Sequence, residues 1–109
     1  MSTLDEVAAE RRRQIDKWGE QNHPDGVATT DVDRVAADTA RRACEQAFAA
    51  GLGTWRVILE EEVREAFAES SVEALRAELI QVAAVAVAWV EAIDRRQASS
   101  GRDSAASAA

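Results

Sequence analysis

The chain has 109 residues and a mass of 11.8 kDa, which is enough for one domain and too little for two. Hydrophobic residues make up 47% and charged residues 30%, which excludes collagen-like, low-complexity and mostly disordered chains. The formal charge of −7 disfavours unaided binding to nucleic acid or to an anionic membrane.

The sequence contains no stretch long enough to span a membrane, no recognisable secretory signal and only one cysteine. The longest nearly uncharged stretch, 79–90, has twelve residues, which is too few to span a bilayer. No secretory signal is recognised, so we expect a cytoplasmic protein. Cys44 is the single cysteine, which excludes an internal disulfide and a cysteine-based zinc site. We expect Cys44 to be a small buried hydrophobe.

The first half of the chain predicts two helices separated by a loop. The first helix runs from about Thr3 to Trp18 and is stopped by Gly19. Residues 21–26 form the loop. The second helix begins at Thr30 or Asp31 and continues to Ala50.

The second half predicts two more helices and a tail. Thr54 caps a helix from Trp55 to about Glu69. Ser70, with Glu73 three residues later, forms a capping box for a helix that ends near Gln97. The fold class is therefore all-α, a four-helix bundle-type domain over 1–97, followed by a disordered Ala/Ser-rich tail over 98–109.

The last helix is apolar over more than one side. One apolar stripe has the spacing of a helix with a single buried face; it comprises Leu75, Leu79, Val82, Ala86, Trp89, Val90 and Ile93. Residues 83–88 add further alanine and valine beside it. This extra width predicts a second partner surface, so we expect a homodimer or a homotetramer.

Three glutamates are expected to face one another across the last two helices. Glu62 and Glu65 are three residues apart, so their side chains are neighbours on one helix face. Glu78 lies at a similar distance from the intervening turn, on the next helix. Oxygen ligands of this kind suit Mg2+ or Mn2+, which in turn bind phosphates. The alternative is a solvated acidic face, which is what most glutamate-rich helices are.

Three segments in order resemble the MazG-like all-α nucleotide pyrophosphohydrolases, the dimeric dUTPase-like superfamily. Residues 58–66 resemble the first metal-binding helix of that family, with its E-x-x-E, and 75–84 resemble the second. Upstream, 14–26 resemble an N-terminal segment of MazG-like proteins. The likeness covers most of residues 10–95.

The resemblance implies hydrolysis of a nucleoside triphosphate to the monophosphate and pyrophosphate. It implies a Mg2+ or Mn2+ site at Glu62, Glu65 and Glu78. Glu61, adjacent to the first ligand, is our candidate for orienting or deprotonating the attacking water. Substrate contacts are predicted for a further group of residues, whose alternative is a plain surface or core role: Lys17, Trp18, Gln21 and His23.

One position departs from the family pattern. Gln81 stands where the family's E-x-x-D has its aspartate, and a glutamine offers a metal an oxygen without charge. A non-catalytic or weakened protein that binds a nucleotide or a partner is therefore the alternative function. A second E-x-x-D, Glu91 to Asp94, lies too far from the turn to meet Glu62 within one chain. The plainest alternative is an oligomeric helix bundle whose acids are only solvated.

Overall fold

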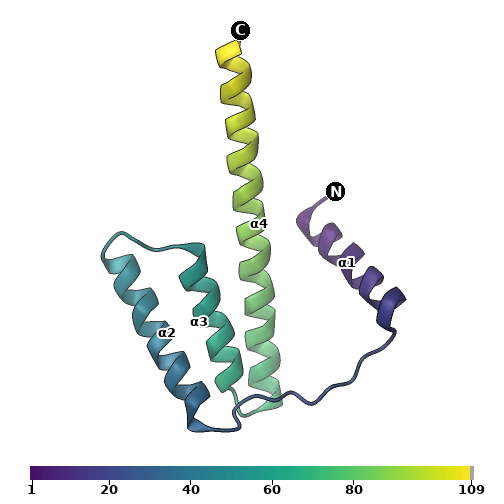
Figure 1. Cartoon of the computed structure of the whole chain (residues 1–109), viewed down its shortest axis with the longest axis vertical. Helices are drawn as coiled ribbons and strands as arrows, with labels where there is room; N and C mark the ends of the chain where they lie inside the picture. The colour runs from purple at the N-terminus through teal and green to yellow at the C-terminus, as the bar shows by residue number, and fades with distance from the viewer. Residues whose placement is uncertain (109) are drawn as a thin grey trace. The chain divides into compact units, whose positions relative to one another are not determined.

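A computed structural model describes residues 1–108 of the chain, with side chains described as far as Gly101. Every regular element in this range is a helix: α1 (Thr3–Trp18), α2 (Asp31–Ala49), α3 (Trp55–Ala68) and α4 (Val72–Ala108) (Figure 1). The all-α prediction is confirmed. No helix within these residues has the length and apolar character needed to cross a membrane.

Local capping explains where the first three helices begin. Ser2 Oγ accepts a hydrogen bond from the Asp5 N–H at 3.1 Å, while Asp5 accepts one from the Ser2 N–H at 2.9 Å. Thr30 and Thr54 cap α2 and α3 in the same way, through the N–H groups of Val32 and Val57. Each cap satisfies a backbone donor that a helix start leaves unpaired.

The start of α4 differs by one residue from the sequence prediction. Ser71, not Ser70, is the cap, because its Oγ accepts from the Ala74 N–H at 3.1 Å and its carbonyl oxygen accepts from the Leu75 N–H at 2.9 Å. The residue at the third helical position is then Ala74, so the predicted capping box with Glu73 is absent. Two adjacent serines offer the same side-chain chemistry, and only the geometry of the turn selects between them.

The end of α4 also differs from the prediction. The helix continues to Ala108, whereas an irregular tail is expected from residue 98. Extending an existing helix requires no new nucleation. The added segment, 98–108, contains four alanines, which favour a helix, but also four serines and one glycine, which favour it less. The last residue of the predicted tail, 109, lies outside the described residues.

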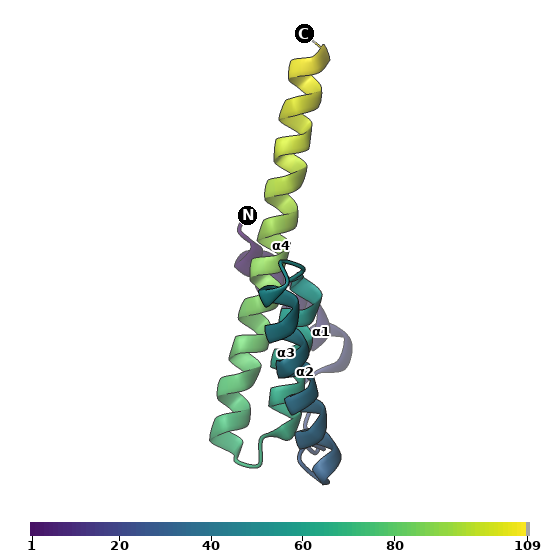
Figure 2. The same ribbon diagram turned by 90° about the vertical axis from the view of Figure 1, so that its left-hand side faces the viewer.

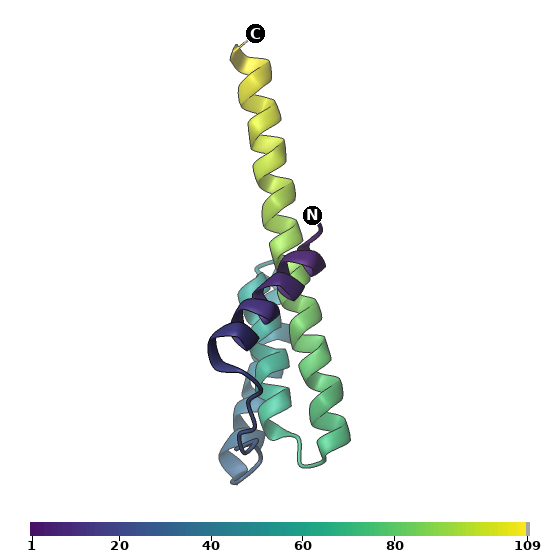
Figure 3. The same ribbon diagram turned by 90° about the vertical axis from the view of Figure 1, so that its right-hand side faces the viewer.

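The chain divides into two compact units. Residues 24–86 form the second unit, which contains α2, α3 and the first part of α4. Residues 1–23 and the chain from Val87 onward form the first unit. Inside the second unit α2 packs against α3, and α3 and α4 run antiparallel from a short turn at 69–71 (Figures 1, 2 and 3).

The core of the second unit is built from small side chains. Its buried residues come from all three helices: Ala37, Cys44, Ala66 and Leu75. None of the described large side chains is fully buried. The segment before α2 is tied to the end of α3, because the Ala28 N–H donates to the Phe67 carbonyl oxygen at 2.8 Å.

The predicted apolar stripe of α4 is only partly buried. Leu75 is buried and Val82 and Trp89 are half-buried, as predicted. Leu79, Ala86 and Val90, in contrast, are exposed. The physical reason is the width of the apolar surface: a single neighbouring helix covers one stripe, and the sequence supplies more than one.

Candidate metal centre

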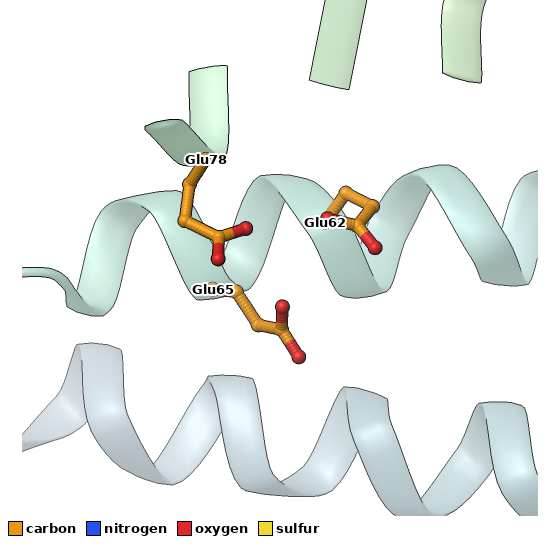
Figure 4. A group of neighbouring side chains, drawn as sticks. All are labelled: Glu62, Glu65 and Glu78. Atoms are coloured by element: carbon orange, nitrogen blue, oxygen red, sulfur yellow. The ribbon is translucent and has the colours of Figure 1, made fainter. Parts of the chain in front are cut away.

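Glu62 and Glu65 on α3 meet Glu78 on α4. One carboxylate oxygen from each residue lies within 4.8 Å of the other two, and all three side chains are half-buried (Figure 4). The predicted convergence is therefore confirmed. It arises because the two α3 residues share a face and the short turn at 69–71 places Glu78 level with them.

These carboxylates carry more negative charge than their surroundings balance. Burial raises the pKa of Glu65 to about 7, and the charges of Glu62, Glu61 and Glu78 add to this effect. Burial also raises the pKa of Glu62, and the negative charge of Glu78 raises it further. None of the ion pairs among the described side chains includes the three glutamates. The cluster therefore favours either a proton or a cation.

One atom of the cluster lacks a hydrogen-bond partner. Glu78 Oε2 is buried and has no hydrogen-bond partner. A buried polar atom without a partner costs about 1–3 kcal/mol, so it is uncommon in a folded protein. An all-oxygen donor set with an unpaired oxygen fits Mg2+ or Mn2+, which prefer carboxylate and water ligands. The residues present therefore fit the predicted ion.

Glu61 lies next to this cluster and faces α2. It is half-buried, and its carboxylate contacts the Cys44 thiol. Burial, then hydrogen bonding and charge from Glu61, raise the pKa of Cys44 to about 11, so the thiol stays protonated and unreactive. The predicted burial of Cys44 is confirmed. Its contact with Glu61 was not predicted, because sequence alone gives no register between α2 and α3.

The remaining predicted ligand is not buried. Gln81 lies one turn beyond Glu78 on α4, and its side chain is exposed. Glu91 and Asp94 are also exposed and do not belong to the carboxylate cluster. The exclusion of this second E-x-x-D from the site stays a prediction.

The four residues predicted to contact substrate lie in the first unit. Lys17 and Trp18 end α1, with the Lys17 Nζ 4.8 Å from the centroid of the Trp18 ring. Gln21 and His23 are exposed in the segment that follows. The three glutamates belong to the second unit. The substrate contacts therefore stay a prediction.

Comparison with protein-family models, with curated proteins and with solved structures found no match to this chain. The resemblance to MazG-like proteins thus rests on short motifs. Of these motifs, the E-x-x-E helix and the glutamate of the next helix are the part whose side chains meet in space.

Proposed function

We propose that the protein is a metal-dependent nucleoside triphosphate pyrophosphohydrolase of the MazG-like type. The observation that carries this proposal is the meeting of Glu62, Glu65 and Glu78 around the unpaired, buried Glu78 Oε2. A solvated acidic face, the plain alternative, gives no reason for half-burying three carboxylates within 4.8 Å of one another.

The chemistry would be divided between the two helices. Glu62, Glu65 and Glu78 would hold Mg2+ or Mn2+, which supplies positive charge for the phosphates and lowers the pKa of water. Glu61 would accept the proton of the attacking water, from its position beside the first ligand. The bond between the α- and β-phosphates breaks, giving a nucleoside monophosphate and pyrophosphate.

The second candidate function is nucleotide or partner binding without catalysis. The observation that favours it is Gln81, which is neutral and exposed where the resembled motif has a ligating aspartate. With three carboxylates instead of four, the site should lose more affinity for a second divalent ion than for a first. A site with one ion retains phosphate affinity while losing part of the charge stabilisation that hydrolysis needs.

The proposal includes assembly into a homodimer or a homotetramer. Large apolar side chains are exposed on every helix; examples are Leu4, Ile15, Val32, Val35, Phe67, Leu79 and Ile80. Complete burial of a fully exposed side chain of this kind is worth about 1.5–3 kcal/mol, and these residues, which are 40–71% exposed, would gain part of it. Association is the simplest way for so small a chain to gain that free energy.

The direct test is pyrophosphate release from a panel of ribo- and deoxynucleoside triphosphates with Mg2+ or Mn2+. Glu62→Gln should abolish release, because it removes a ligand charge and keeps the shape. Glu60→Gln is the matched control, since Glu60 is exposed on the same helix. Absence of release from any nucleotide by the folded natural protein would reject hydrolysis. Nucleotide binding by that inactive protein would then favour the second candidate.

A further inference from the structure

A thiol on α2 and a carboxylate on α3 lie level with each other in the second unit. Cys44 is five residues before Ala49, where α2 ends. Glu61 is six residues after Trp55, where α3 begins. The loop 50–54 joins these two ends, and α2 packs against α3 (Figures 1 and 2). At about 1.5 Å per residue, the two positions differ in level by only about 1.5 Å. The geometry of the helix pair thus accounts for the contact between Cys44 and Glu61.

Cys44 is the residue of α2 that can donate a hydrogen bond toward α3. It is 8% exposed. The other buried and half-buried positions of α2 hold only alanine and aspartate: Asp33, Ala36, Ala37, Asp38, Ala40 and Ala47. Alanine has no polar hydrogen and an ionised carboxylate only accepts hydrogen bonds, whereas a protonated thiol is a donor, although a weak one. Because the pKa of Cys44 is raised to about 11, its thiol keeps the proton at neutral pH.

The Glu61 carboxylate lies between this thiol and a proposed metal ligand. It takes part in no ion pair among the described side chains. It lies within hydrogen-bonding reach of Glu65, one turn further along α3. A glutamate has three rotatable side-chain bonds, and a base acts efficiently only when it is held near the atom whose proton it takes. A neutral donor restricts the carboxylate without supplying a positive charge that would compete with the metal ion.

We propose that Cys44 is a positioning residue, whose S–H donates a hydrogen bond to the Glu61 carboxylate and holds that carboxylate toward the glutamate cluster. The inference rests on the proposed function, in which Glu61 accepts the proton of the attacking water. It gives the single cysteine of the chain a role that does not require the thiol to react.

The S–H stretching band in the Raman spectrum tests the hydrogen bond without any reaction. Because Cys44 is the single cysteine, the protein gives one such band. Hydrogen bonding lowers the frequency of this band, so Glu61→Ala should raise it in the metal-free protein. Glu60→Ala is the matched control, because Glu60 is exposed on the same helix, and it should leave the frequency unchanged.

An unchanged frequency in Glu61→Ala would overturn the proposal. It would show that the thiol donates elsewhere, for example to a backbone carbonyl one turn earlier in α2, as hydroxyl groups in helices do.

Steady-state pyrophosphate release tests the positioning role. Cys44→Ala should lower kcat about fivefold with little change in KM, because one hydrogen bond to the base is lost and no substrate contact is removed. Cys44→Ser should restore most of kcat, since a hydroxyl group is also a donor. Ala47→Gly is the packing control: it weakens α2 one turn away and keeps the thiol, so kcat should stay unchanged.

Two kinetic outcomes would reject the positioning role. One is an unchanged kcat in Cys44→Ala. The other is an equal loss of kcat in Cys44→Ala, Cys44→Ser and Ala47→Gly, which would show that position 44 acts through packing alone. Absence of pyrophosphate release by the natural protein would instead overturn the proposed function, whereas the S–H band would still decide whether Cys44 donates to Glu61.

Discussion

Glu65 on α3 and Glu78 on α4 bring carboxylate oxygens within 4.8 Å of each other, although thirteen positions of sequence separate them. Like charges at this distance, partly removed from water, repel one another unless a proton or a cation lies between them. The behaviour of the protein toward protons and toward divalent ions is therefore linked through this pair. Competition between protons and divalent ions for these carboxylates leads to two predictions.

Mg2+ or Mn2+ should stabilise the folded protein. A ligand that binds only the folded state adds about 2.7 kcal/mol at a concentration about 100 times its Kd. For a chain of this size that corresponds to an increase in Tm on the order of 10 °C. Thermal unfolding with increasing Mg2+ or Mn2+ measures the shift. Glu65→Gln should remove most of it, and Glu60→Gln should preserve it. An equal shift in both variants would indicate binding elsewhere.

Without divalent ions, the free energy of unfolding should fall as pH rises from about 4.5 to about 7. The pKa of Glu65 is raised from 4.5 to about 7 in the folded state, so within this window the folded chain binds more protons than the unfolded chain. Stability then decreases with increasing pH, and the contribution is fully lost above the folded-state pKa.

Urea denaturation in a chelator, repeated across this pH range, measures that slope. Glu65→Gln should flatten the curve relative to the natural protein, because its side chain does not titrate. Glu60→Gln should leave the curve unchanged. A natural protein and a Glu65→Gln variant with parallel curves would show that Glu65 does not titrate in this window.

The convergence of the three glutamates on α3 and α4 is the part of the site that sequence predicts well. Glu62 and Glu65 share a face because of helical spacing alone, and the short turn at 69–71 fixes the level of Glu78. Both are local properties of a continuous segment. The contact between Cys44 and Glu61 is different, because it depends on how α2 is rotated and shifted against α3. Small residues such as Ala37 and Ala66 allow several such registers, and sequence does not choose among them.

The same limit applies to burial along the helices. Apolar spacing correctly identifies helices, but on α4 it does not tell which stripe faces α3. Leu75 and Leu79 are both apolar, yet one is buried and the other is 49% exposed. Helix ends are predicted to within about a residue where a cap residue is unique, as at Thr54. The predicted start of α4 is wrong by one residue, because Ser70 and Ser71 offer the same capping chemistry. Its predicted end near Gln97 is wrong by a larger margin, because the helix continues to Ala108.

The position of the α4 cap can be tested by a matched pair of substitutions. Ser71→Ala should destabilise the protein by about 1 kcal/mol, because the Ala74 N–H loses its hydrogen-bond acceptor. Ser70→Ala should change stability by less than about 0.5 kcal/mol, as surface substitutions usually do. Urea denaturation of both variants measures the difference. A larger loss of stability in Ser70→Ala than in Ser71→Ala would show that Ser70 caps α4, as the sequence predicts.

Gln81→Asp tests whether the departure from the resembled motif weakens the site. Gln81 lies one turn beyond Glu78, so a carboxylate there adds charge on the side of α4 next to the cluster. We expect Mg2+ to bind about tenfold more tightly, which corresponds to about 1.4 kcal/mol. Calorimetric titration with Mg2+ measures the affinity, and pyrophosphate release measures the activity.

Gln97→Asp is the matched control for this substitution, because Gln97 is exposed and remote on the same helix. Tighter Mg2+ binding together with increased hydrolysis would identify Gln81 as the cause of a weakened enzyme. Tighter binding without hydrolysis would favour a protein that binds nucleotides without cleaving them. Equal affinities in the two variants would mean that position 81 takes no part in the metal centre, so that Glu62, Glu65 and Glu78 supply its protein ligands without it.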